Sequence, residues 1–233
     1  MKLAIMQPYF LPYIGYFQLM AAVDKFVVLD DVNYIVRGWV NRNRIATQQG
    51  TRWVTIPVEN ASQNRPISEL NIAADSGWKR SISNVVCQAY RDASQAEVVV
   101  PQFARWIEGA HGNLSIFLGS LLCQVRDMLG IATEVVASSS VYPKNGLRGA
   151  SRIVDICRRE NATTYINLTG GRELYDREQF AAAGVELRFI ELALQPAQLI
   201  HGGDEGPLLS ILDLLMHNEI GALQRAAKHY VLN

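Results

Sequence analysis

The sequence predicts an α/β fold, in which a parallel sheet is flanked by helices and a helical insertion lies in the middle of the chain. Two stretches of alternating strands and helices lead to this prediction, one at the N-terminus and one over residues 133–190. Between them, residues 75–130 place apolar side chains at helical spacing. We therefore expect a single α/β domain over residues 1–233, with a helical lobe over about residues 75–130.

The N-terminal stretch reads as a strand, a turn, a helix and a second strand. Residues 3–6 form a short apolar run that is typical of a buried parallel strand, and residues 26–30 form the second strand. The turn over residues 7–16 then lies at the carboxyl end of the sheet, where open α/β folds bind ligands. The candidate ligand contacts in this turn are Gln7, Pro8 and Gly15.

The second strand ends in two adjacent carboxylates, Asp30 and Asp31. Neighbouring residues at a strand end point to opposite sides, so we expect one of the two to face the ligand. A general base, a metal ligand and an amine-binding group are all open roles for that carboxylate.

The next stretch, residues 32–45, combines arginine and asparagine with aromatic side chains. Guanidinium groups bind phosphate and carboxylate bidentately, so the stretch is a candidate anion site. The alternative is a solvated surface loop. Its candidate ligand-binding residues are Tyr34, Trp39, Asn41, Arg42, Asn43 and Arg44.

Further strands and helices are expected in the middle and C-terminal parts of the chain. The valine run over residues 98–100 reads as a short strand, and Pro101 is suited to the first turn of a following helix. Further along, a strand over residues 185–190 is expected to close the sheet, and an amphipathic helix over residues 221–229 is a candidate dimer face.

Two loops of the second half carry further candidate contacts. Lys144 and Arg148 lie in a glycine-containing loop after a strand, and they are candidate anion contacts; a charged surface loop is the alternative. Asn167 ends the next strand, and Gly170 and Gly171 precede an expected helix over residues 173–183. Glycines let backbone N–H groups approach a ligand, and a helix N-terminus favours an anion, which makes this turn a candidate anion or carboxylate seat.

Composition limits the classes of function. The chain has 22 basic and 22 acidic residues, which does not favour binding to nucleic acid or to a membrane surface. The three cysteines have no metal-site spacing, and their odd number favours a reduced compartment. No signal peptide is visible, and no apolar run approaches the roughly 18 residues of a membrane helix. We expect a soluble, cytoplasmic protein without a metal cluster.

Several blocks of the sequence resemble the WbqC-like family. The clearest are Met6-Gln-Pro-Tyr-Phe-Leu-Pro-Tyr-Ile-Gly-Tyr16, Asp30-Asp-Val-Asn-Tyr34, Gly38-Trp-Val-Asn-Arg-Asn-Arg-Ile45, Arg152-Ile-Val-Asp-Ile-Cys157, Tyr165-Ile-Asn167, Gly170-Gly171 with Leu174-Tyr175, and Leu209-Ser-Ile-Leu-Asp213. The resemblance covers nearly the whole chain. The family name implies biosynthesis of O-antigen lipopolysaccharide and related cell-surface polysaccharides.

A more distant resemblance concerns the N-terminal turn. Pro12-Tyr-Ile-Gly-Tyr16 stands where nucleotidyltransferases and pantothenate synthetases carry proline followed by His-x-Gly-His, and those enzymes bind ATP over this turn. The resemblance implies a nucleotidyltransferase-like fold. Tyr13 and Tyr16 replace the two histidines, and they stay neutral at pH 7 while still able to donate hydrogen bonds to phosphate or to an oxyanion. The alternative is that both tyrosines pack the helix onto the sheet.

Together these resemblances imply an enzyme, a transferase or an ATP-dependent amide ligase. It would join an acyl or aminoacyl group from a small acyl donor to the amine of a nucleotide-linked amino sugar, with Asp30, Asp31, Tyr13 and Tyr16 as catalytic residues. One alternative is a non-catalytic protein that binds a nucleotide sugar. Another is nucleotidyl transfer to a sugar phosphate, for which Asp30 or Asp31 would hold Mg²⁺. The need for ATP and for Mg²⁺ stays open at this point.

Overall fold

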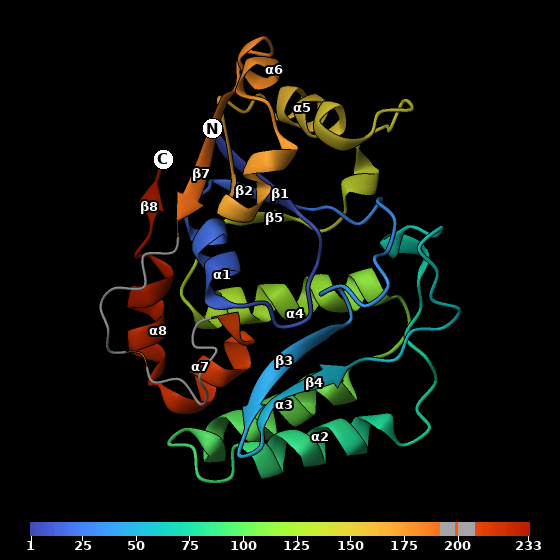
Figure 1. Cartoon of the computed structure of the whole chain (residues 1–233), viewed down its shortest axis with the longest axis vertical. Coiled ribbons are helices and arrows are strands. Elements are labelled where there is room, and N and C mark those ends of the chain that lie inside the picture. Colours follow the sequence, from blue (N-terminus) through green and yellow to red (C-terminus); the bar gives the residue numbers. More distant parts are fainter. Residues whose placement is uncertain (192–198, 200–207) are drawn as a thin grey trace.

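The main sheet is mostly parallel (Figure 1), in a computed structural model that describes residues 1–191, 199 and 208–233. Within this part of the chain its strand order is β5-β2-β1-β6-β7-β8, and β8 alone runs antiparallel to its neighbour. The strands are β1 Lys2–Met6, β2 Lys25–Val28, β5 Glu134–Val136, β6 Thr164–Leu168, β7 Glu186–Glu191 and β8 Val231–Leu232. Taken in chain order, the five parallel strands read 3-2-1-4-5, the doubly wound order that reverses between β1 and β6.

Helices cover both faces of this sheet, which confirms the α/β fold. Figure 1 shows α5 and α6 on one side, and α1 and α4 on the other. Their bounds are α1 Ile14–Ala21, α4 Leu114–Met128, α5 Gly149–Arg159 and α6 Arg177–Ala181. Successive residues of β1 alternate between the two cores: Leu3 and Ile5 pack with the α5 and α6 side, and Ala4 packs with the other. Burial on both faces explains the continuous apolar run of this strand.

The arginine- and asparagine-rich stretch ends in a second, two-stranded sheet. Here β3 Arg42–Thr47 pairs antiparallel with β4 Gly50–Thr55, with Arg44 opposite Trp53. This hairpin is separate from the main sheet. Residues 42–45, read from the sequence as part of a loop, are strand residues whose pairing partner follows immediately in the chain.

The expectation of a strand over the three valines is wrong. Residues 98–100 lie in α3 Ala96–Glu108, and Pro101 is inside this helix instead of in its first turn. Val99, Phe103, Trp106 and Ile107 are buried along one face of α3. Burial of that face offsets the β-preference of the valines and the hydrogen bond that the proline removes.

Two expectations for the second half also need correction. The glycine turn does not lead directly into a long helix, because Thr169–Leu174 form a 3₁₀ helix and α6 begins only at Arg177, capped by Asp176. Gly170 and Gly171 are thus not at the N-terminus of α6. In addition, β7 does not close the sheet, since β8 pairs with its free edge.

The remaining helices fill the lower half of the view in Figure 1. They are α2 Trp78–Ala89, α3, α7 Ile211–His217 and α8 Ile220–Ala227. α2 packs on α3, α3 on α7, and α8 on α1. A helical lobe over about residues 75–130 within one domain stays a prediction. In the part of the chain that the structure describes, no helix is long and apolar enough to cross a membrane.

Candidate functional site

A cavity of about 560 Å³ lies at the carboxyl ends of β1 and β6, where the strand order reverses. We call it the switch-point cavity. It extends to Leu29, directly after β2, and to Asn43 and Arg44 on β3. The described residues that line it are Ile5, Met6, Gln7, Tyr9, Pro12, Tyr13, Leu29, Trp39, Asn43, Arg44, Asn167, Leu168, Gly170, Gly171, Leu174, Tyr175 and Leu208. The position is the one at which doubly wound folds bind ligands.

A strained turn forms one wall of the switch-point cavity. Leu11 has a φ of 42°, a left-handed conformation that an ordinary residue adopts only when its surroundings impose it. Asn43 supplies that constraint, because its Nδ2 donates to the carbonyls of Phe10 at 3.0 Å and Leu11 at 2.8 Å. Ser210 Oγ donates a further hydrogen bond of 2.8 Å to the Leu11 carbonyl. These contacts hold the turn so that Tyr13 lines the cavity.

The tyrosines that line this cavity are neutral hydrogen-bonding groups. Burial raises the pKa of Tyr13 to about 12, with a smaller contribution from the electrostatic interaction with the neighbouring phenol of Tyr9. Burial likewise raises the pKa of Tyr9 and of Tyr175. At pH 7 these phenols are protonated, so they can donate hydrogen bonds but cannot act as general bases.

The two tyrosines of the N-terminal motif have different surroundings. Tyr13 lines the cavity, whereas Tyr16 is fully buried and donates a hydrogen bond of 2.8 Å to the Gln7 carbonyl. Its ring packs against Phe26 and Phe17. Tyr16 thus supports the backbone of the cavity wall from behind.

Amide groups complete the neutral lining. Gln7 Oε1 is buried and has no hydrogen-bond partner within the described part of the chain, so a ligand donor would satisfy it. Asn167 is held in place: its Nδ2 donates to Tyr165 Oη at 3.1 Å, and its Oδ1 accepts from the Leu168 N–H at 2.7 Å.

Gly171 is required by its close approach to Asn167. A Cβ atom at position 171 would lie 3.0 Å from Asn167 Nδ2, whereas one at Gly170 would meet nothing within 4 Å. Gly171→Ala should therefore lower the free energy of unfolding by about 1–3 kcal/mol, the usual cost of overpacking. Gly170→Ala is the matched control and should be close to neutral. Equal unfolding midpoints for the two variants in urea would contradict this.

A second cavity, of about 520 Å³, adjoins the first, and we call it the basic cavity. The two share Leu29, Leu174 and Tyr175. The basic cavity is lined by Leu29, Val32, Asn33, Lys144, Gly146, Leu147, Arg148, Gly149, Ala150, Arg152, Ile153, Leu174 and Tyr175. It lies beside the N-terminus of α5, whose partial positive charge adds to that of the basic side chains.

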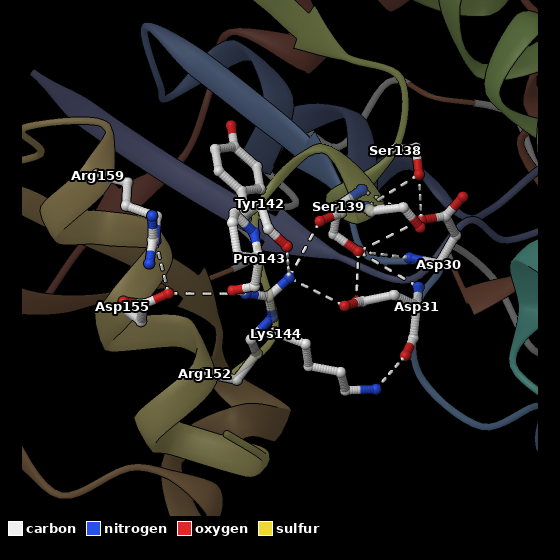
Figure 2. Close-up of polar contacts among 11 residues, drawn as sticks. Asp30, Asp31, Ser138, Ser139, Tyr142, Pro143, Lys144, Arg152, Asp155 and Arg159 are labelled. Atoms are coloured by element: carbon white, nitrogen blue, oxygen red, sulfur yellow. Dashed lines mark hydrogen bonds and ion pairs between the residues drawn. The ribbon is translucent and has the colours of Figure 1, made fainter. Parts of the chain in front are cut away.

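The two aspartates converge on one serine instead of pointing to opposite sides: both carboxylates lie within hydrogen-bond reach of Ser139 Oγ (Figure 2). Asp30 is buried, and its carboxylate accepts hydrogen bonds from Ser115 Oγ at 2.7 Å, Ser138 Oγ at 2.7 Å and the Ser139 N–H at 3.1 Å. Asp31 accepts from Ser139 Oγ at 2.5 Å. Hydrogen-bond donors surround Asp30, and a metal ion needs acceptor oxygens, so this arrangement does not fit a Mg²⁺ site.

Arg152 joins Asp31 to the loop that precedes α5 (Figure 2). The side chain is almost fully buried, and its Nη2 lies 2.9 Å from Asp31 Oδ2. The same guanidinium donates to the carbonyls of Ser139, Tyr142 and Pro143 at 2.9–3.0 Å. Lys144 Nζ donates to the Asp31 carbonyl at 2.6 Å. The network fixes the backbone that leads to Lys144 at the rim of the basic cavity.

Comparison with known proteins identifies the family of this chain. A model of the WbqC-like protein family matches residues 7–225. The chain belongs to the WbqC-like protein family. The uncharacterized protein Rv1507c of Mycobacterium tuberculosis is 30% identical over 218 residues, which span 93% of this chain and 93% of that protein. No solved structure matches the chain.

In this WbqC-like protein the predicted site residues divide into three groups. Those that line the switch-point cavity are Gln7, Tyr13, Trp39, Asn43, Arg44, Asn167, Gly170 and Gly171. Those that line the basic cavity are Lys144 and Arg148. Those outside the lining of both cavities are Pro8, Gly15, Tyr16, Asp30, Asp31, Tyr34, Asn41 and Arg42. In the last group, Tyr34 and Asn41 are buried partners, with Tyr34 Oη donating to Asn41 Oδ1 at 2.6 Å.

Sequence reasoning missed three polar residues of the site. Tyr9 lies in the same turn as Tyr13, and its position between Pro8 and Pro12 was a usable signal. Tyr175 belongs to both cavities but follows its strand by several residues, so strand-end reasoning did not reach it. Arg152 lies within an amphipathic helix, where an arginine is ordinarily expected on the solvent side.

Proposed function

We propose that this WbqC-like protein transfers an acyl or aminoacyl group to the amine of a nucleotide-linked amino sugar, in the biosynthesis of a surface polysaccharide such as O-antigen. One observation carries the proposal: two cavities of similar volume lie side by side at the carboxyl edge of the sheet and share the lining residues Leu29, Leu174 and Tyr175. A reaction between two substrates needs two adjoining sites whose reacting atoms meet at the junction.

The linings of the two cavities suit different substrates. In the switch-point cavity Arg44 is the one charged side chain among the described lining residues, and tyrosine, glutamine and asparagine supply neutral hydrogen bonds. Such a lining suits a sugar with a diphosphate near Arg44. The basic cavity carries Lys144 and Arg148 beside the N-terminus of α5, which suits a carboxylate or phosphate of the acyl donor.

The proposed step is a nucleophilic acyl substitution. The amine nitrogen forms a bond to the acyl carbon, the bond from that carbon to its leaving group breaks, and the leaving group keeps the electron pair. The amine proton passes to water at the open mouth of the cavity. We expect Tyr13, which lines the switch-point cavity and is protonated at pH 7, to donate a hydrogen bond to the oxyanion that develops.

Product mass tests this proposal. The protein is incubated with a dTDP- or UDP-linked 4-amino sugar and candidate acids or amino acids, with and without ATP. An added acyl mass together with AMP release would identify an ATP-dependent ligase. An added acyl mass without AMP, from an activated donor, would identify a transferase.

Variants of the basic cavity make the test specific. Each of Lys144→Ala and Arg148→Ala should weaken acyl-donor binding by about 1.5–3 kcal/mol if it removes an anion contact. Arg158→Ala is the control, because Arg158 is exposed at the other end of α5. If product forms with unchanged KM for the donor in both cavity variants, the assignment of this cavity fails.

The second candidate function is non-catalytic binding of a nucleotide sugar. The described lining residues of both cavities include no carboxylate that could act as a base for the amine, and this favours binding without catalysis. Tight binding of the sugar nucleotide with no change of mass across the donor panel would establish this function and exclude the transfer.

A further inference from the structure

We propose that Trp39 and Trp53 form the subsite for the nucleobase of the ligand. The proposal rests on the proposed function in one respect, namely that the ligand of the switch-point cavity is a nucleotide sugar. Trp39 lines that cavity, and Trp53 lies on β4 directly beside it. The subsite is therefore an outward continuation of the same site.

Both indole rings are exposed and close together. Trp39 is 39% exposed and Trp53 is 41% exposed, and their ring centroids are 5.2 Å apart. The other two tryptophans differ: Trp78 Nε1 donates to the Ala73 carbonyl, and Trp106 Nε1 donates to Gln124. Within the described residues the indole N–H groups of Trp39 and Trp53 have no such partner. Two adjoining exposed indoles offer an aromatic surface on which a planar ring can stack.

The backbone around Trp39 holds this surface in place. Gly38 allows a tight turn, since a Cβ there would lie 2.9 Å from the Ile35 carbonyl oxygen. The Phe10 N–H donates to the Trp39 carbonyl at 3.2 Å, which ties Trp39 to the turn after β1. A preorganised surface costs less conformational entropy when a ligand binds, so this rigidity favours a binding role.

Arg42 fixes the second ring. Its guanidinium lies 4.0 Å from the centre of the Trp53 ring, and its Nε donates to the Gly38 carbonyl at 3.1 Å. The same guanidinium donates to the Arg37 carbonyl. The contacts of Arg42 join the turn before Trp39 to β4, so this arginine is a positioning residue for the two indoles.

The order of groups along the site matches the order of parts in a nucleotide sugar. Arg44 lies next to the rings, with its guanidinium 5.3 Å from the centre of the Trp39 ring, and it also lines the cavity. The neutral lining formed by Gln7 and Asn167 belongs to the same cavity at the ends of β1 and β6. A nucleotide sugar would therefore place its base on the tryptophans, its diphosphate at Arg44 and its sugar at the neutral lining.

Nucleotide binding to a Trp39 variant tests the inference. The dissociation constants of dTDP, UDP and inorganic pyrophosphate are measured by calorimetry for the full chain and for Trp39→Ala. If the base stacks on the Trp39 ring, Trp39→Ala should raise the dissociation constants of dTDP and UDP by about 5- to 150-fold. The dissociation constant of pyrophosphate should stay unchanged. Trp39→Tyr keeps an aromatic face and should recover most of the affinity, and Trp53→Ala provides a second variant if Trp39→Ala does not fold.

The outcomes separate this inference from the proposed function. Three outcomes would overturn the base subsite. The affinity for dTDP is unchanged in Trp39→Ala and Trp53→Ala, or the affinity for pyrophosphate falls as much as that for dTDP, or the full chain binds no nucleotide. Binding of a free hexose that depends on Trp39, with no base dependence, would overturn it in favour of a sugar ring. If the base dependence is found and no acyl product ever forms, the transfer fails and the subsite stands.

Discussion

Replacement of Arg152 by methionine is expected to lower the free energy of unfolding by about 3–5 kcal/mol, the cost of leaving a buried ion without its partner. Arg152→Met preserves much of the side-chain volume but removes the guanidinium that contacts Asp31 and three loop carbonyls. The Asp31 carboxylate is left with little access to water, and the carbonyls lose their donor. Lysine is not expected to restore stability, because one ammonium cannot reproduce the fork of donors.

A second arginine of the same helix provides the control. Arg159 also pairs with a carboxylate, at 2.8 Å from Asp155 Oδ2, but its side chain is 36% exposed. Exposed pairs contribute about 0–1 kcal/mol, so Arg159→Met should have little effect on urea unfolding. If the free energy of unfolding falls equally in the two variants, the contacts of Arg152 with Asp31 and the loop carbonyls do not stabilise the fold as proposed.

The second large effect is expected for Asp30→Ala, which should lower the free energy of unfolding by about 2–6 kcal/mol. The Asp30 carboxylate is the acceptor for the Ser139 N–H and the Ser115 hydroxyl, and both donors are buried. Each buried donor that loses its acceptor costs about 1–3 kcal/mol. Because Ser115 lies on α4 and Ser139 follows β5, the variant should loosen the junction between them.

Asp127→Ala is the control for this change, since Asp127 pairs with Arg126 while its own side chain is 63% exposed. Urea unfolding of both variants should show the difference. A ligand that binds the folded state should still raise the stability of Asp30→Ala, because Asp30 does not line either cavity. A fully stable Asp30→Ala that no longer binds the sugar nucleotide would instead indicate a direct role in recognition.

Local patterns in the sequence were sufficient for most of the main sheet. The apolar runs of β1 and β2, the helix between them and the later alternation up to β7 identify a parallel sheet flanked by helices, since a strand buried on both faces has to be apolar throughout. The same reasoning predicted a ligand site at the edge shared by the carboxyl ends of the parallel strands, and the switch-point cavity lies at this edge.

Elements whose partners are distant were harder to predict. The valines of α3 favour a strand by propensity, but the segment is helical because one helical face, with Val99, Phe103, Trp106 and Ile107, is buried. β8 has two residues, and it is a strand because β7 offers it an unpaired edge. Neither signal is contained in the segment itself.

By itself, the sequence determined the fold class, the family and the turn that lines the switch-point cavity. Tertiary structure alone decided which side chains face that cavity. Tyr13 and Tyr16 are both tyrosines of one motif, and only the packing of Tyr16 on Phe26 separates the lining residue from the buried one. Asp30 and Asp31 become structural acceptors because serines that follow β5, a serine on α4 and an arginine from α5 reach them across the fold. Local patterns report on neighbours in the chain, whereas the direction and solvation of a polar group depend on neighbours in space.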